Sequence, residues 1–403
     1  MLRKLHTMSK LDYIDQSAIR RYRLERVRSL SALEDVAAVL LFDPVSIRYA
    51  NGSRNMQVWT MHNFCRYALV STAGPSVMFD GTTGHHLLEG LETIDEIRPA
   101  WSSDYLISGY RAEEISERWA SEIADLINQY GGGNRRLAVD RLDVDTAKAL
   151  IAAGLELVDA KKIMEHARSI KSLEEISALK HSLSTCEAAM AELRAQLVPG
   201  MSEQQALAIL LKGSIERGGE YPETRLMTSG PRTNPWFQET SDRVIENGDF
   251  LSFDTDLIGP MGFYNDISRS WVIGDAKPTD EQRRLYEISR AQLETNISLL
   301  QPGMEFLEFA SKAYELPEEY LANRYADVGH GCGLGVEYPF LWYPEDKALG
   351  AYDGVFEENM VVCIESYVGE AGGHEGVKLE QPVWISADGP VVLSEYPLEL
   401  DYL

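Results

Sequence analysis

Three aspartates stand in an apolar stretch from Phe250 to Trp271, and this stretch constrains the fold more than any other part of the chain. It reads FLSFDTDLIGPMGFYNDISRSW. Side chains two residues apart on a strand share a face, so Asp254 and Asp256 are expected to point the same way. The turn residues Gly-Pro-Met-Gly at 259–262 would fold the second half back as a β-hairpin. Asp266 would then lie across from the pair.

These three carboxylates need a positive partner. Set close together among apolar side chains, they cannot all stay charged and dry without one. The stretch contains no lysine, and Arg269 is its single positive charge. A bound divalent cation resolves the conflict best. The alternative is an edge hairpin whose aspartates face water.

Three later segments offer further ligands. His330 stands among glycines in VGHGCG, Glu365 follows the apolar run MVVCI, and Glu380 closes GVKLE. Each one alone is more often a loop histidine or a solvated strand end. Together, one histidine and five carboxylates form an oxygen-rich set that suits Fe, Mn, Zn or Co. Such a ligand number permits two ions about 3.5–4 Å apart.

Length and charge narrow the class of protein. A chain of 403 residues exceeds the usual size of one hydrophobic core, so two domains are expected. The formal charge of -25 argues against nucleic acid and anionic membranes as partners. The N-terminus has no apolar signal region, and no stretch is long enough to span a membrane. Four scattered cysteines suit reduced thiols, so we expect a cytoplasmic protein.

The order of elements predicts a mixed α/β protein. Residues 1–30 have a helical, charged pattern, and apolar runs at 36–42, 67–72 and 75–81 predict strands. Apolar residues recur at helical spacing over 113–130, and strands alternate with helices to about Ala160.

A repeated pattern marks the second part of the chain. Capping-box sequences begin helices at Ser172, Ser202 and Thr279. The helices before 197–201 and 300–304 both stop at the sequence Leu-x-Pro-Gly-Met. This recurrence hints at internal duplication. We expect a curved sheet cradled by paired helices.

The order Asp, Asp, His, Glu, Glu, with the histidine in a Gly-His-Gly-x-Gly turn, resembles the methionine aminopeptidase–prolidase–creatinase superfamily and its pita-bread fold. The segment ARSIK at 167–171, followed by EEI, is similar to the linker of that superfamily. The resemblance implies a creatinase-like N-terminal domain at residues 1–165 and a catalytic domain at residues 166–403. It also implies two divalent metal ions and a homodimer.

Longer stretches are similar to the dimethylsulfoniopropionate lyases of the DddP type. They are ETRLMTSGPRTNPWFQE, FDTDL, NDISRSW and the Tyr338-Pro339 context. In those lyases both aspartates of the FDTD run bind metal. The resemblance therefore implies six ligands: Asp254, Asp256, Asp266, His330, Glu365 and Glu380.

Two departures bear on activity. Peptidases of the superfamily carry one histidine near the position of Trp236 and Phe237 and another at the position of Glu337. The lyases carry an aspartate base six residues after the metal histidine, where this chain has Val336. Glu337 is the neighbouring candidate for the base, although successive strand residues face opposite ways.

The resemblance implies a lyase that cleaves a small carboxylate substrate such as dimethylsulfoniopropionate. A sulfonium cation would be held by aromatic faces, with about 0.5–2 kcal/mol per cation–π contact. The candidates for this role are Trp236, Phe237, Tyr338 and Trp342. An Xaa-Pro dipeptidase-type metallohydrolase is the alternative. A metal-free binding protein is a third, disfavoured because unneeded buried carboxylates would destabilise the fold.

Overall fold

The computed structural model describes residues 14–399, which fall into two compact units. One comprises Asp15–Arg168, and the other includes residues 169–399. This boundary and the predicted one after residue 165 both fall within helix α7 (Lys161–Ser169). Each unit is described by itself.

The first unit is built on a six-stranded mixed sheet of order β4-β3-β2-β1-β5-β6. Its strands are β1 (Ala38–Leu41), β2 (Tyr67–Ser71), β3 (Ser76–Asp80), β4 (Glu96–Pro99), β5 (Arg136–Val139) and β6 (Glu156–Asp159). Its helices, besides α7, are α1 (Gln16–Leu33), α2 (Pro44–Asn51), α3 (Gln57–Thr60), α4 (Tyr105–Ser108), α5 (Ala112–Tyr130) and α6 (Val144–Ala152), with 3-10 turns η2 (His85–Leu88) and η3 (Gly109–Arg111).

The predicted strands and the long helix of this unit are confirmed. The apolar runs at 36–42, 67–72 and 75–81 contain β1, β2 and β3, each fully buried. The helix α5 places Trp119, Ile123 and Ile127 in the core against the sheet. The helix expected over residues 1–30 is α1, and residues 1–13 of that prediction lie outside the described part.

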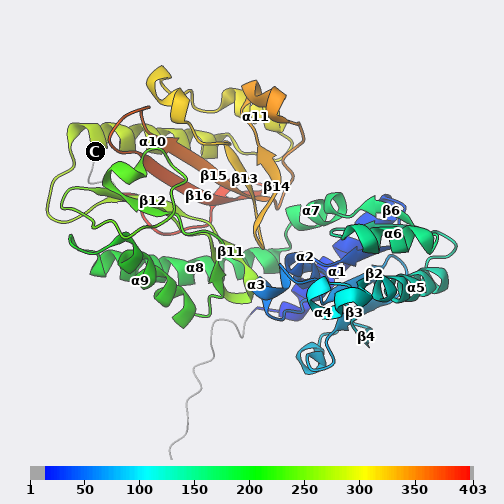
Figure 1. Ribbon diagram of the computed structural model, residues 1–403. Helices are drawn as coiled ribbons and strands as arrows, with labels where there is room; N and C mark the ends of the chain where they lie inside the picture. Colours follow the sequence, from blue (N-terminus) through cyan, green and yellow to red (C-terminus); the bar gives the residue numbers. More distant parts are fainter. Residues whose placement is uncertain (1–13, 400–403) are drawn as a thin grey trace, which may run out of the picture. The chain divides into compact units, whose positions relative to one another are not determined.

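The second unit combines curved antiparallel sheets with long helices (Figure 1). Its strands are β7 (Tyr221–Pro222), β8 (Met227–Ser229), β9 (Phe250–Asp254), β10 (Leu257–Ile258), β11 (Tyr264–Asn265), β12 (Ser268–Val272), β13 (Gly329–Cys332), β14 (Val336–Leu341), β15 (Val361–Val368), β16 (Val377–Ser386) and β17 (Gly389–Val392). Its helices are α8 (Leu173–Gln196), α9 (Glu203–Glu216), α10 (Asp280–Leu299) and α11 (Phe306–Lys312), with 3-10 turns η4 (Gly230–Thr233), η5 (Pro260–Gly262), η6 (Glu318–Asn323) and η7 (Pro344–Leu349).

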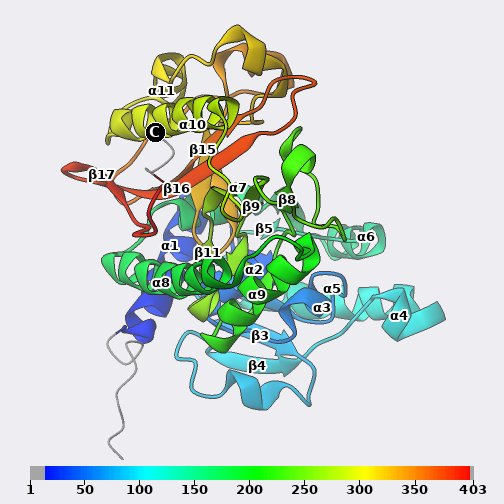
Figure 2. The same cartoon turned by 90° about the vertical axis from the view of Figure 1, so that its left-hand side faces the viewer.

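Paired helices flank the sheets, as predicted. The helix α10 packs on β15 and β16, and Figures 1 and 2 both show it along one face of that sheet. The helix α8 lies beside α9 and contacts β11. Ser172, Ser202 and Thr279 each form the expected capping box. None of the helices in residues 14–399 combines the length and apolar composition needed to cross a bilayer.

The predicted hairpin over Phe250–Trp271 is confirmed, with an interruption. β9 pairs with β12 and β10 with β11, and η5 forms the turn between them. Between β9 and β10, Asp256 has a φ of 42°, which breaks the strand. Asp254 and Asp256 are therefore not neighbours on one face of a continuous strand.

The two Leu-x-Pro-Gly-Met segments have the same backbone environment. Gly200 and Gly303 both have positive φ, and their N–H groups donate to the carbonyls of Ile245 and Phe356. The N–H groups of Ile245 and Phe356 in turn donate to the carbonyls of Met201 and Met304. The correspondence extends to the hydrogen bonds and supports the internal duplication that the sequence indicates.

Candidate metal centre

The six predicted ligands converge within the second unit. They come from the ends and crossings of strands: Asp254 from β9, Asp256 from the β9–β10 break, Asp266 from the step between β11 and β12, His330 from β13, Glu365 from β15 and Glu380 from β16. Each is at most 6% exposed. Five carboxylates buried in one place are a strong indication of a bound cation.

His330 lies at the middle of one group of these side chains. Its Nε2 lies 3.5 Å from Asp266 Oδ2, 3.5 Å from Glu365 Oε1 and 4.0 Å from Glu380 Oε1. A carboxylate oxygen from each of Asp254, Asp256 and Asp266 forms a second group, with all three atoms within 4.8 Å of one another. Since Asp266 contacts both groups, the geometry fits two cations that share this carboxylate.

Three carboxylate oxygens at the centre lack a hydrogen-bond donor. Asp254 Oδ1, Asp266 Oδ1 and Glu380 Oε1 are buried and accept no hydrogen bond from any residue in the described part of the chain. Buried polar atoms are nearly always satisfied in folded proteins. Divalent metal ions in contact with these oxygens would satisfy them.

A lysine that the sequence analysis did not include lies inside the cluster. The Nζ of Lys378 is 3.3 Å from Asp254 Oδ2 and 3.3 Å from Glu380 Oε2, and it also donates to Glu365. Arg269, the single positive charge of the Phe250–Trp271 stretch, donates instead to backbone carbonyls, including that of Glu380 at 2.9 Å. Five ionised carboxylates less one ammonium leave four negative charges, which two divalent cations would cancel.

Crowding of these charges changes the acidity of the cluster. Burial and the neighbouring carboxylates raise the pKa of Asp266 and Glu380 well above their usual range. Burial and Asp254 together raise the pKa of Asp256 to about 6. Burial also opposes ionisation of Asp254, but Lys378 and nearby hydrogen bonds outweigh it and lower its pKa.

His330 gains basicity from the same neighbours. Burial alone would lower its pKa, but Glu365, Asp327 and Glu380 raise it to about 10. Without metal the cluster therefore retains protons. Because metal ligands must give up their protons, metal binding here is coupled to proton release.

The glycines beside His330 are required by close packing. A Cβ added at Gly329 would lie 2.4 Å from the carbonyl oxygen of Cys363, and one at Gly331 would lie 2.3 Å from that of Tyr338. A Cβ at Gly333 would lie 2.4 Å from Glu337 Oε2. Backbone and side-chain atoms therefore approach this turn too closely for any residue larger than glycine.

The predicted base, Glu337, points away from Val336 on β14. Its side chain is buried, forms an ion pair with Lys171 at 3.2 Å, and accepts a hydrogen bond from the Leu334 N–H at 2.8 Å. Val336 is 50% exposed. The two side chains leave opposite faces of the strand, so Glu337 does not occupy the place of a side chain at position 336. The base role of Glu337 stays a prediction.

The predicted aromatic residues divide into two groups. Trp236 and Phe237 lie close to the cluster: the Lys378 Nζ is 5.8 Å from the Trp236 ring, and Phe237 stacks on Tyr325 at 5.3 Å. Tyr338 stacks on Tyr352, and Trp342 contacts Phe340. Phe237 is 59% exposed and has a φ of 64°, an unusual conformation for a bulky residue. Such strained residues are common at functional sites.

Two further residues were missed from the sequence. The ring of Tyr325 lies 4.6 Å from the Lys378 ammonium. Asp327 is buried, and burial raises its pKa to about 7 although His330 opposes that rise. Both precede His330 by a few residues, and this position is the only signal in the sequence that could have pointed to them.

Comparison with known proteins agrees with this architecture. The model of Metallopeptidase family M24 matches residues 177–387, and that of the Creatinase/Prolidase N-terminal domain matches residues 23–170. A dimethylsulfoniopropionate lyase DddP from Roseovarius nubinhibens is 38% identical over 390 residues, covering 96% of this chain and 87% of that protein. A protein of the same name from Roseobacter denitrificans is 37% identical, and the match covers 98% of this chain and 89% of that protein.

A solved structure has the same fold over nearly the whole chain. The Xaa-Pro dipeptidase from Bacillus anthracis superposes with a TM-score of 0.75 at 22% identity, covering 94% of this chain and 99% of the other. At this identity the likeness establishes the fold alone. The fold is a creatinase-type N-terminal α/β domain followed by a pita-bread catalytic domain.

Proposed function

Since the chain belongs to Metallopeptidase family M24 and is a DddP-like member of its creatinase and prolidase branch, we propose that it is a metal-dependent lyase acting on a small carboxylate substrate. The observation that carries this proposal is the position of Asp256 beside the other two aspartates. Its carboxylate joins those of Asp254 and Asp266 within 4.8 Å, which supports the six-ligand set of the lyases that the chain resembles.

The proposed reaction is a β-elimination. Two divalent ions held by the six residues would bind the substrate carboxylate and stabilise the negative charge that develops as the adjacent carbon loses its proton. A base on the protein takes that proton, the electron pair forms the carbon–carbon double bond, and the leaving group departs with the electrons of its bond to the β-carbon. For dimethylsulfoniopropionate, the substrate in the relatives' names, the products are acrylate, dimethyl sulfide and a proton.

The aromatic side chains next to the cluster favour a cationic leaving group. The Lys378 ammonium already lies over the faces of Trp236 and Tyr325, which shows that these rings accept a positive charge at close range. The exposed ring of Phe237, stacked on Tyr325, extends the same surface to solvent. A sulfonium group would bind along it.

Hydrolysis of Xaa-Pro dipeptides is the second candidate, supported by the M24 match. Against it stand Trp236, Phe237 and Glu337, where the peptidases carry histidines that bind and polarise the peptide. Glu337 also forms an ion pair with Lys171, so it is not positioned as a peptide ligand.

One sample of metal-loaded protein separates the two candidates. Headspace detection of dimethyl sulfide and nuclear magnetic resonance of acrylate would follow elimination from dimethylsulfoniopropionate and other β-substituted propionates. A parallel assay would follow Xaa-Pro hydrolysis. Elimination that is lost in Asp266→Asn supports the lyase. Dipeptide turnover with a kcat of order 1 per second or more, without any elimination, would establish the hydrolase instead.

The homodimer and the cytoplasmic location stay predictions. We propose the dimer on the resemblance alone, and analytical ultracentrifugation of the full chain tests it.

A further inference from the structure

A cysteine shares the metal centre with the six carboxylate and imidazole ligands. Cys363 lies on β15 directly across from His330 on β13. It is two residues before Glu365 on the same strand, so the two side chains share a face. The residue is 0% exposed. The thiol is thus directed at the cluster by the register of the sheet.

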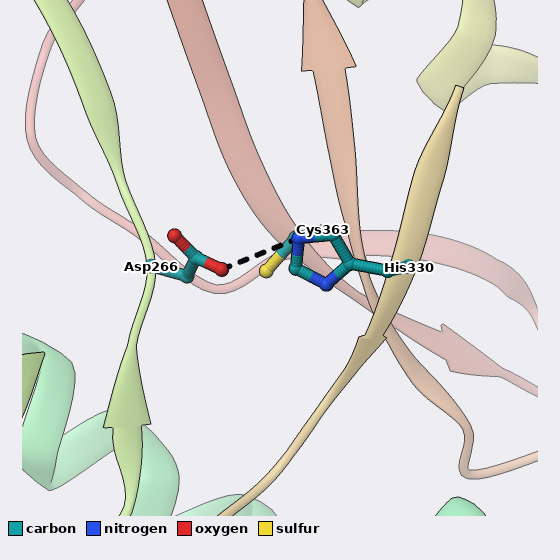
Figure 3. Close-up of side chains that lie close together, drawn as sticks. All are labelled: Asp266, His330 and Cys363. Atoms are coloured by element: carbon teal, nitrogen blue, oxygen red, sulfur yellow. Dashed lines mark ion pairs between the residues drawn. The ribbon is translucent and has the colours of Figure 1, made fainter. Parts of the chain in front are cut away.

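The sulfur lies within 4.8 Å of ligand atoms of two of the predicted ligands. Figure 3 shows Asp266 and His330 joined by their ion pair, with the Cys363 sulfur beside them. A carboxylate oxygen of Asp266, a ring nitrogen of His330 and the Cys363 sulfur all lie within 4.8 Å of one another. Metal bonds of about 2.0–2.3 Å place two ligands of one tetrahedral ion about 3.3–3.8 Å apart. The Asp266–His330 separation of 3.5 Å already meets this condition.

We propose that Cys363 is a further ligand at the ion held by Asp266 and His330, and that its sulfur makes this position select thiophilic divalent cations such as Zn²⁺, Co²⁺ and Cd²⁺ over Mn²⁺. Thiolates favour softer metals, whereas carboxylates alone suit Mn²⁺. The inference rests on the proposed metal centre and adds the identity of the ions that it takes.

A purely structural role would treat Cys363 as a small apolar side chain. Its surroundings do not fit that role, because they include the charged groups of Asp266 and His330 rather than the apolar core. A second observation also indicates a ligand: Asp266 Oδ1 is buried and has no hydrogen-bond partner among residues 14–399. An ion bound by the Asp266 carboxylate would give this oxygen a partner.

The neighbouring thiol of Cys332 provides a matched control. Cys332 lies on β13, is also fully buried, and its sulfur lies 3.6 Å from the carbonyl oxygen of Tyr264. It is not in the group formed by Asp266, His330 and Cys363. Cys332→Ser therefore replaces a sulfur that contacts the Cys363 thiol with a hydroxyl, while leaving the proposed ligand in place.

The test is Co²⁺ loading of the metal-free full-length protein, with bound cobalt counted by equilibrium dialysis and its ultraviolet absorption recorded. We expect a thiolate-to-cobalt charge-transfer band in the wild type and in Cys332→Ser, and none in Cys363→Ser. In competition with Mn²⁺, Cys363→Ser should lower the preference for Cd²⁺ by at least about 10- to 100-fold, because a direct ligand is lost and removal of an outer-shell partner alone has an effect of this size.

The outcomes separate the two proposals. Wild-type protein that binds Co²⁺ without a charge-transfer band overturns the role of Cys363 and leaves the lyase proposal intact. A band that survives in Cys363→Ser and disappears in Cys332→Ser would show that Cys332 is the sulfur ligand, and this result also overturns the role of Cys363. Failure of the wild type to bind Co²⁺ at all would overturn both proposals. The wild-type spectrum does not depend on the folding of any variant.

Discussion

Glu365 and Glu380 face each other as a direct cross-strand pair on β15 and β16, and both are at most 1% exposed. Like charges directly opposite in a sheet destabilise it. Lys378 contacts both carboxylates, but it also contacts Asp254, so one ammonium serves three acids. The pair therefore depends on further positive charge, from His330 or a bound cation, or on bound protons.

Glu380→Gln should stabilise the metal-free protein at neutral pH. The pKa of Glu380 is raised well above its usual range, so the folded chain holds a proton there that the unfolded chain releases. Between the unfolded and folded pKa values this group lowers stability as pH rises. Glutamine removes that effect and should raise the free energy of unfolding of the metal-free protein.

Chemical denaturation of metal-free protein measures this change, with the exposed Glu358→Gln as control. The same Glu380→Gln variant should lose most of the stabilisation that metal gives the wild type. A variant less stable than wild type without metal would show that Glu380 is ionised and well compensated.

Asp266 should control occupancy of both ions. It belongs to the group around His330 and to the three-aspartate group. We expect about two metal equivalents in the loaded wild type and loss of both in Asp266→Asn. Asp256→Asn should lose only one. Elemental analysis after dialysis provides the count, and an Asp266→Asn protein that keeps two ions would remove the bridging role.

Metal binding should weaken as pH falls through 6. The pKa of Asp256 is raised to about 6, so below that pH the carboxyl is protonated in the metal-free chain. A ligand must be deprotonated to bind, and this group alone should lower the apparent affinity by about tenfold between pH 7 and pH 5. Isothermal titration with Mn²⁺ at the two pH values tests this. In Asp256→Asn the pH dependence should be smaller, and an equal dependence in both proteins would assign it to another group.

Val336→Asp should raise elimination from dimethylsulfoniopropionate. Valine cannot act as a base, and a general base contributes typically 10²–10⁴-fold in rate. Since Val336 is 50% exposed, an aspartate there carries little cost of burial. Headspace measurement of dimethyl sulfide for wild type, Val336→Asp and the matched Val336→Asn isolates the effect of the carboxylate.

Glu337→Gln tests the rival base on the same assay. If Glu337 is the base, the wild type is already active and this variant is not. Its stability must be measured alongside, because removing one partner of the buried pair with Lys171 typically costs about 3–5 kcal/mol. A fast wild type with an equally fast Glu337→Gln places the base on another residue.

The sequence was sufficient for the features that depend on local pattern. Turn residues and alternating apolar residues predicted the hairpin that carries the aspartates, and the capping boxes predicted the starts of α8, α9 and α10. The detail that failed was the continuous strand through Asp254 and Asp256. Asp256 has a positive φ and accepts hydrogen bonds from Thr224 and Tyr264, which are tertiary contacts that no local rule supplies.

Other features depend on which face of a strand meets which neighbour. Lys378 was visible two residues before Glu380, yet only the register of β15 and β16 shows that it enters the carboxylate cluster. Glu337 adjoins the position of the missing base in sequence, but the pleat of β14 turns it toward Lys171. In the sequence Cys363 is one residue of an apolar strand, and only the pairing of β13 with β15 shows that it lies beside His330.

The repeated Leu-x-Pro-Gly-Met segments divide the catalytic unit into two halves, and each half supplies three of the six predicted ligands. The half that follows Met201 supplies Asp254, Asp256 and Asp266, and the half that follows Met304 supplies His330, Glu365 and Glu380. Neither half contains a complete coordination shell. A metal pair held by all six residues would therefore require both halves to be folded and docked, and its set of ligands would be complete only once Glu380 has been synthesised.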